Sequence, residues 1–134
     1  MQKIKTILIV DDDEDDRELF CEAVNEISKD IHCIHAENGV AALELLNAEK
    51  EFVPDYIFMD LNMPRLNGKQ CLQEIKKIQH VKNVPVIIYS TSNLLHDKEE
   101  TRTLGAADFL HKPSEFRLLC RQIENVFSGV QLTA

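Results

Sequence analysis

Short apolar runs rich in branched residues alternate along this chain with segments that have the period of an amphipathic helix. This alternation limits the folds that the chain can adopt. The first, third and fourth runs are almost continuously apolar, as expected for strands that are covered on both faces. Five such runs predict strands at residues 6–10, 31–36, 55–60, 85–90 and 107–112.

Each apolar run is followed by a predicted helix. Clear apolar stripes mark the first, third and fifth helices, near residues 19–27, 71–78 and 116–127. The second helix is expected over about 39–49 and the fourth over about 93–104. The fourth has few large apolar residues, so we expect it to be loosely held. Ser114 is the predicted N-cap of the last helix.

Five β–α units in succession call for a parallel sheet with right-handed crossovers and helices on both faces. We therefore predict an α/β fold, a (βα)5 flavodoxin-like three-layer sandwich with strand order 2-1-3-4-5. The 134 residues fit a single domain. Ligands of such folds bind beyond the carboxyl ends of the strands, at the switch point between strands one and three.

Composition and charge exclude several classes of function. A net charge of −8 with scattered Lys and Arg argues against binding to nucleic acid. No apolar run approaches the roughly 20 residues that span a bilayer, and residues 1–13 do not resemble a signal peptide. We therefore expect a cytoplasmic protein. The four cysteines form no CxxC pair, and three of them fall on apolar faces of predicted elements, so we expect all four to be reduced thiols.

Polar side chains gather at the carboxyl ends of the predicted strands. Three close carboxylates repel one another, and a divalent cation such as Mg²⁺ relieves that repulsion. Beside the cation, one carboxylate can act as a nucleophile toward a phosphoryl group, while a lysine neutralises phosphoryl oxygens and a hydroxyl donates a hydrogen bond. The residues that converge there are Asp11 and Asp12 after strand one, Asp60 after strand three, Ser90 and Thr91 after strand four, and Lys112 after strand five.

The acidic run continues beyond Asp12 with Asp13, Glu14, Asp15 and Asp16. These four residues are expected in the first turn of the following helix, where negative charge favours the positive end of the helix dipole. The alternative is that these four residues surround the metal ligands as an outer shell or contact a partner protein. An EF-hand is excluded because no glycine stands at loop position 6.

Four segments together resemble the receiver domain of bacterial two-component response regulators. They are "ILIVDDD", "PDYIFMDLNMPRLNG", "VPVIIYSTS" and "GAADFLHKP", in this order and at this spacing. The resemblance covers about residues 3–128 and leaves a short C-terminal tail. It implies a stand-alone receiver over residues 1–134.

The resemblance also implies residue roles. Asp60 would accept the phosphoryl group, in a Mg²⁺- or Mn²⁺-dependent reaction, from a histidine kinase or a histidine phosphotransfer protein. Asp11 and Asp12 would form the acidic metal pair with Asp60, and Asn62 would add its backbone carbonyl. Lys112 would contact the phosphoryl group, and the Lys112–Pro113 peptide bond would be cis. The resemblance further implies that Ser90 is the switch hydroxyl, that Phe109 is the aromatic switch residue and that Thr91 is a neighbour of the phosphoryl site.

On this interpretation the chain is a signalling phosphoacceptor rather than an enzyme, with only self-catalysed phosphoryl transfer and autodephosphorylation. Its output would pass to an unknown downstream protein, without nucleic acid or membrane. Two alternatives remain. One is a phosphatase or phosphotransferase of haloacid-dehalogenase type, which Asn62 disfavours because a second aspartate is needed two residues after the nucleophile. The other is a pseudo-receiver that acts only as a binding scaffold.

Overall fold

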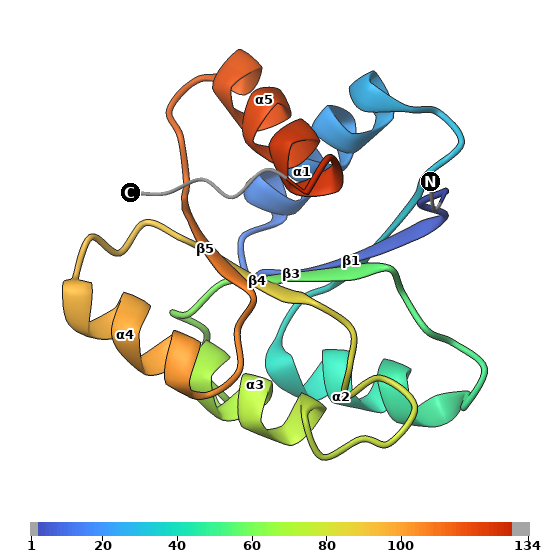
Figure 1. Cartoon of the computed structure of the whole chain (residues 1–134), viewed down its shortest axis with the longest axis vertical. Coiled ribbons are helices and arrows are strands. Elements are labelled where there is room, and N and C mark those ends of the chain that lie inside the picture. Colours follow the sequence, from blue (N-terminus) through green and yellow to red (C-terminus); the bar gives the residue numbers. More distant parts are fainter. Residues whose placement is uncertain (1–2, 130–134) are drawn as a thin grey trace.

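The computed structural model describes residues 3–129, and in it five strands alternate with five helices. The strands form one parallel sheet of order β2-β1-β3-β4-β5 (Figure 1), so the predicted fold class is confirmed. The strands are β1 (Thr6–Val10), β2 (His32–Ala36), β3 (Tyr56–Met59), β4 (Val86–Ser90) and β5 (Asp108–His111). The helices are α1 (Glu14–Ile27), α2 (Gly39–Ala48), α3 (Gly68–Ile75), α4 (Leu95–Thr103) and α5 (Phe116–Phe127).

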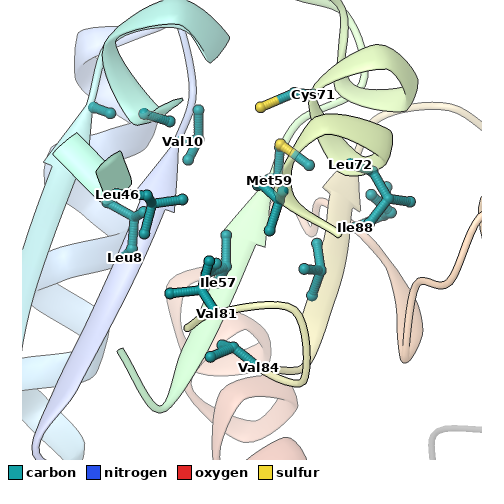
Figure 2. Close-up of a cluster of buried hydrophobic side chains, with 14 of the residues drawn as sticks. Leu8, Val10, Leu46, Ile57, Met59, Cys71, Leu72, Val81, Val84 and Ile88 are labelled. Carbon is teal, nitrogen blue, oxygen red and sulfur yellow. The ribbon is translucent and has the colours of Figure 1, made fainter. Parts of the chain in front are cut away.

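Helices cover both faces of the sheet. In Figure 1, α1 and α5 lie together on one face, and α2, α3 and α4 lie on the other. Alternate residues of β1 serve the two faces: Leu8 and Val10 pack on the α2–α3 side, whereas Ile7 and Ile9 pack on the α1–α5 side. Figure 2 shows the first of these clusters, in which Met59 and Ile88 of neighbouring strands face Leu72 of α3. Burial on both faces explains the nearly continuous apolar runs.

Side-chain caps define where the first three helices begin. Asp13 Oδ1 accepts from the N–H of Asp16, and Asn38 Oδ1 accepts from the N–H of Ala41. Asn67 and Gln70 form a reciprocal capping box at α3. The predicted cap of α5 is wrong by one residue. Glu115 rather than Ser114 occupies the N-cap, without a side-chain bond, because the helix begins at Phe116.

Two further expectations are wrong. No peptide bond within residues 3–129 is cis, so the Lys112–Pro113 bond is trans, the isomer that X-Pro bonds intrinsically favour. Cys21 of α1 and Cys33 of β2 form a disulfide instead of remaining thiols, because the crossover brings their Cα atoms to 5.6 Å. Cys71 and Cys120 are free. Within the described part of the chain, no helix is long and apolar enough to cross a membrane.

Candidate functional site

The site lies at the carboxyl edge of the sheet, where the parallel strands β1, β3, β4 and β5 end side by side. Val10 pairs with Met59, so the residues that follow, Asp11 and Asp60, are neighbours, and the N–H of Asp60 donates to the carbonyl of Val10 at 3.0 Å. Lys112 follows β5, and its N–H donates to the carbonyl of Ser90 at 2.8 Å. The topology therefore brings these predicted residues to one rim.

Three carboxylates at this rim form one cluster. Asp11, Asp12 and Asp60 each offer a carboxylate oxygen, and these oxygens lie within 4.8 Å of one another. Asp11 and Asp60 are buried, whereas Asp12 is exposed. Asp11 already uses both oxygens, since Oδ1 accepts from the N–H of Asp13 at 3.0 Å and Oδ2 from Lys112 at 2.7 Å.

The Lys112 ammonium is the cation that compensates this cluster. Its Nζ lies 2.7 Å from Asp11 Oδ2, 2.8 Å from Asp16 Oδ2 and 3.6 Å from Asp60 Oδ2. Only 10% of its side chain is exposed, and Nζ also lies 5.4 Å from the centre of the Tyr89 ring. The contact with Asp16 is one that the sequence did not predict, because six consecutive acids carry no signal of which one faces the lysine.

Burial controls the acidity of these groups. Desolvation is the main reason that the pKa of the Asp60 carboxyl is raised; Lys112 opposes the rise and the Asp11 charge adds to it. Desolvation also raises the pKa of Asp11, against the hydrogen bond from Lys112. The pKa of Lys112 is raised above its usual value, because its carboxylate partners outweigh its own desolvation. The ammonium is therefore held charged within the cluster.

Ser90 and Thr91 lie at the carboxyl end of β4, and Phe109 lies within the adjacent strand β5, where it pairs with Ile88. Ser90 is fully buried, and its Oγ accepts from the N–H of Ser92 at 3.2 Å. Thr91 is exposed, and its carbonyl lies 3.1 Å from Nε2 of His111. Phe109 is half-buried and packs against the hydrophobic cluster on the α2–α3 side of the sheet, with Lys98 Nζ 5.9 Å from the ring centre. Phe109 thus lies on the face that α4 covers.

The loop between β3 and α3 closes over the end of β3. Asn62 is exposed in this loop, directly after buried Leu61, and the N–H of Leu61 donates to Asp60 Oδ1 at 2.8 Å. The N–H of Gly68 donates back to the carbonyl of Leu61 at 2.9 Å. A Cβ at Gly68 would overlap the carbonyl oxygen of Asp60, so this glycine is required by close approach.

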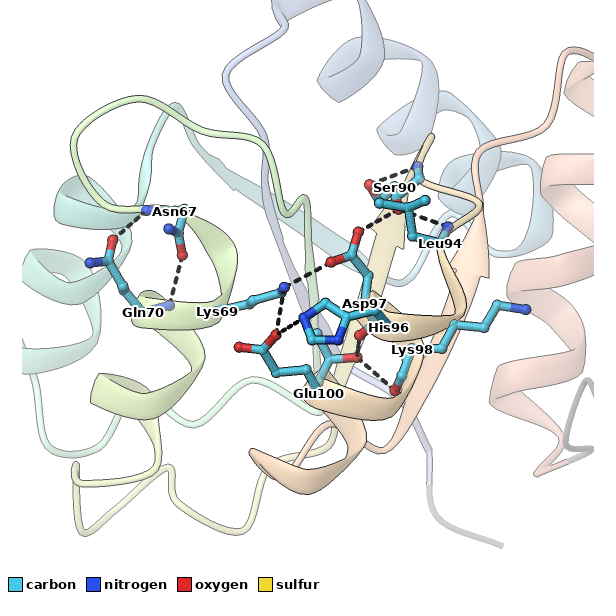
Figure 3. Close-up of polar contacts among 11 residues, drawn as sticks. Asn67, Lys69, Gln70, Ser90, Leu94, His96, Asp97, Lys98 and Glu100 are labelled. Atoms are coloured by element: carbon cyan, nitrogen blue, oxygen red, sulfur yellow. Dashed lines mark hydrogen bonds and ion pairs between the residues drawn. The ribbon is translucent and has the colours of Figure 1, made fainter.

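A polar cluster that the sequence did not predict joins α3 to α4 (Figure 3). Lys69 Nζ lies 2.7 Å from Asp97 Oδ1 and 2.9 Å from Glu100 Oε2. Ser92 Oγ donates to Asp97 Oδ2 at 2.5 Å. Because Ser92 also donates its N–H to Ser90 Oγ, hydrogen bonds run from Ser90 to the first turn of α4.

The carboxylate cluster fits a hard divalent cation. Mg²⁺ and Mn²⁺ prefer oxygen ligands and accept a small number of carboxylates together with water. One carboxylate here is exposed to solvent and two are buried, with raised pKa values that a cation would oppose. A closed site for zinc would need thiolate or imidazole ligands, and the cluster contains none.

A parallel sheet of this order, with three carboxylates and a lysine at its carboxyl edge, defines the class of phosphoryl-accepting α/β signalling domains. The family model for the response regulator receiver domain matches residues 7–124. This chain belongs to the response regulator receiver family. Members of the family are signalling phosphoacceptor domains that bind a divalent metal and interact with histidine kinases or phosphotransfer proteins.

Three relatives illustrate the similarity. PilH of Pseudomonas aeruginosa is 36% identical over 96 residues, which are 72% of this chain and 77% of PilH. The response regulator Rcp1 of Synechocystis sp. is 29% identical over 128 residues, 92% of this chain and 87% of Rcp1. Its Mn(2+)-bound structure has a TM-score of 0.81 at 28% identity and covers 97% of this chain and 96% of its own. The phosphorylated cyanobacterial phytochrome response regulator RcpA has a TM-score of 0.84 at 27% identity, over 98% and 97% of the two chains.

Proposed function

We propose that Asp60 accepts a phosphoryl group from the phosphohistidine of a histidine kinase or a histidine phosphotransfer protein. The observation that carries this proposal is the buried Asp60 carboxylate, which shares a rim with two further carboxylates and lies 3.6 Å from the Lys112 ammonium. In the transfer an Asp60 oxygen bonds to phosphorus while the phosphorus–nitrogen bond breaks. The donor imidazole keeps the electron pair of that bond and takes a proton from water.

Asp11, Asp12 and Asp60, with the backbone carbonyl of Asn62, would hold Mg²⁺ or Mn²⁺. The bound cation would neutralise negative charge on the transferring phosphoryl group. Asp12 is the carboxylate that can turn to a cation most freely, because it is exposed while both oxygens of Asp11 already accept hydrogen bonds. The Mn(2+)-bound structure of Rcp1 supports this assignment.

Lys112 and Ser90 would respond to the phosphoryl group. Lys112 is a charged donor beside Asp60, and Ser90 presents a buried hydroxyl at the end of the adjacent strand. If Ser90 Oγ turns toward the phosphoryl oxygens, its bond from the N–H of Ser92 is lost, and Phe109 can move inward beneath α4. Thr91, next to Ser90, would border the phosphoryl group. The phosphorylated structure of RcpA supports a phosphorylated state for this fold.

The proposed output is binding to a downstream protein through a surface that changes on phosphorylation. We place the protein in the cytoplasm, as one receiver domain over residues 1–134, without binding to nucleic acid or membrane. The only chemistry proposed for it is phosphoryl transfer to itself and autodephosphorylation.

The test is to incubate the protein with Mg²⁺ and acetyl phosphate and to measure its intact mass. One phosphoryl adduct is expected, absent in Asp60→Asn and in EDTA and retained in Asp15→Asn, which removes an exposed carboxylate outside the cluster. Sustained hydrolysis of phosphate esters would instead favour a phosphatase. No adduct on a folded, Mg²⁺-saturated protein would favour a binding scaffold.

A further inference from the structure

Asp16 holds the Lys112 ammonium more closely than the proposed phosphoacceptor does. The distance from Nζ to Asp16 Oδ2 is 2.8 Å, that of a charge-assisted hydrogen bond, whereas the distance to Asp60 Oδ2 is 3.6 Å. An ammonium has three N–H donors. Two of them are used by Asp11 and Asp16, so Asp60 receives the longest of the three contacts.

The backbone of α1 determines where Asp16 lies. Asp13 caps the helix by accepting from the N–H of Asp16, so the main chain of Asp16 is fixed at the start of α1. Its side chain is 39% exposed, in contrast to the fully buried side chain of Asp11. Asp16 is thus a partner for Lys112 that comes from the solvent side of the site.

Asp11 and Asp16 differ in their relation to a cation. The cluster of possible metal ligands among residues 3–129 contains Asp11, Asp12 and Asp60 but not Asp16. A cation bound by that cluster competes with Lys112 for the oxygens of Asp11, because Oδ2 accepts from Lys112 and Oδ1 from the N–H of Asp13. Asp16 has no such competitor, so its bond to Lys112 can persist.

We propose that Asp16 is a positioning residue, which keeps the Lys112 ammonium beside Asp60 when a bound cation competes with Lys112 for the carboxylate of Asp11. This inference rests on the proposed phosphoryl transfer to Asp60. Asp16 touches neither the phosphoryl group nor the cation in this role and acts through Lys112. It thereby supplies the contact that Asp11 gives up, and it keeps a charged donor directed at the developing phosphoryl charge.

Asp15 provides the matched control. It is exposed and lies in the same first turn of α1, and its carboxylate makes no hydrogen bond or ion pair to a residue that the structure describes. Asp15→Asn and Asp16→Asn change the net charge equally and weaken the favourable interaction with the helix dipole by a similar amount. Only Asp16→Asn removes the charge that faces Lys112. Asp16→Glu restores that charge and serves as the conservative rescue.

Two readouts are needed, and the first does not depend on phosphorylation. The side-chain ammonium of Lys112 is observed by ¹H–¹⁵N NMR in saturating Mg²⁺ and assigned with Lys112→Arg. We expect a slowly exchanging signal in the wild type, in Asp15→Asn and in Asp16→Glu, and its loss in Asp16→Asn. The second readout is the rate of adduct formation with acetyl phosphate, which we expect to fall about tenfold in Asp16→Asn and less than about twofold in Asp15→Asn.

The outcomes separate the two proposals. An ammonium signal and a rate in Asp16→Asn that match those of Asp15→Asn would overturn the role of Asp16. Loss of the signal with an unchanged rate would overturn it as well, because the contact would then not serve the transfer. If the wild type forms no adduct, the proposed phosphorylation fails, while the ammonium signal still shows whether Asp16 holds Lys112.

Discussion

The main chain of Gly68 lies directly against the carbonyl oxygen of Asp60, at a distance that leaves no room for a Cβ atom. The N–H of Gly68 also donates to the carbonyl of Leu61, so two segments of the β3–α3 loop are fixed to each other. The position of the Asp60 carboxylate therefore depends on a glycine eight residues further along the chain.

Gly68→Ala is expected to lower the free energy of unfolding by about 1–3 kcal/mol, the usual cost of forcing a methyl group into a packed site. It should also slow phosphorylation of Asp60, because relief of the overlap moves the end of β3. Urea denaturation and the mass-based rate measure the two effects. Gly39→Ala is the comparison: its Cβ would meet Leu66 at 3.0 Å, a tight contact but without overlap. A Gly68→Ala protein that is as stable as Gly39→Ala would contradict the argument.

Asp60→Asn is expected to stabilise the metal-free protein at neutral pH, by about 1 kcal/mol. Burial raises the folded-state pKa of Asp60 above its value of 3.8 in an unfolded chain. Below the pKa that Asp60 has in the unfolded chain, the carboxyl is protonated in both states and burial does not penalise the folded state. As the pH rises through the higher pKa that Asp60 has in the folded protein, the carboxyl ionises in its buried position and this stability is lost. Asparagine does not ionise, so the gain should be visible at pH 7.5 and should vanish below about pH 4.

Urea denaturation in EDTA at the two pH values measures this difference. Asp15→Asn serves as the control for the loss of one negative charge, since Asp15 is exposed. A wild type that is more stable than Asp60→Asn at pH 7.5 would show that the contact with Lys112 outweighs the desolvation of Asp60.

Mg²⁺ is expected to raise the melting temperature of the wild type and to do so less in Asp12→Asn. A ligand present at 100 times its Kd stabilises the native state by about 2.7 kcal/mol. Asp12 offers the exposed carboxylate of the cluster, so its loss should weaken binding and reduce the shift at a fixed Mg²⁺ concentration. Asp15→Asn should keep the wild-type shift, and equal shifts in both variants would exclude Asp12 as a ligand.

Lys69→Ala is expected to increase hydrogen exchange in α4. Lys69 makes ion pairs with Asp97 and Glu100, and Thr101 is the one residue of α4 that is buried, so few apolar contacts hold this helix. Amide protection over residues 95–103 should therefore fall. Lys77→Ala removes the exposed ion pair with Glu74 and should leave α4 unchanged. The same exchange in both variants would mean that the α3–α4 ion pairs do not restrain the helix.

The Cys21–Cys33 disulfide is expected to leave only two thiols available for alkylation in the unfolded, unreduced protein, those of Cys71 and Cys120. Reduction should lower the free energy of unfolding by about 2–3 kcal/mol, as expected for a crosslink that closes a loop of this size. Mass spectrometry after iodoacetamide treatment counts the thiols, and Cys21→Ser provides the protein without the crosslink. Four adducts without reductant would contradict the pairing.

The order of strands and helices was predictable because each element has a local signal. Strands β1, β3 and β4 are apolar on both faces, and helices such as α5 carry an apolar stripe of helical period. The boundaries were less predictable. The α5 cap differs from the prediction by one residue: the N-cap preference of serine favours Ser114, whereas the helix begins one residue later, after Glu115, without a side-chain cap.

The fold class, the family and the sheet edge at which Asp11, Asp60, Ser90 and Lys112 meet could all be inferred from the sequence, because parallel strands present their carboxyl ends to one side. In contrast, the contacts of Lys112 with Asp11 and Asp16, and the pairing of Cys21 with Cys33, became apparent only in the folded structure. Such pairings depend on distances between side chains from different elements. Those distances are set by how helices pack on the sheet, and no local pattern of residues encodes them.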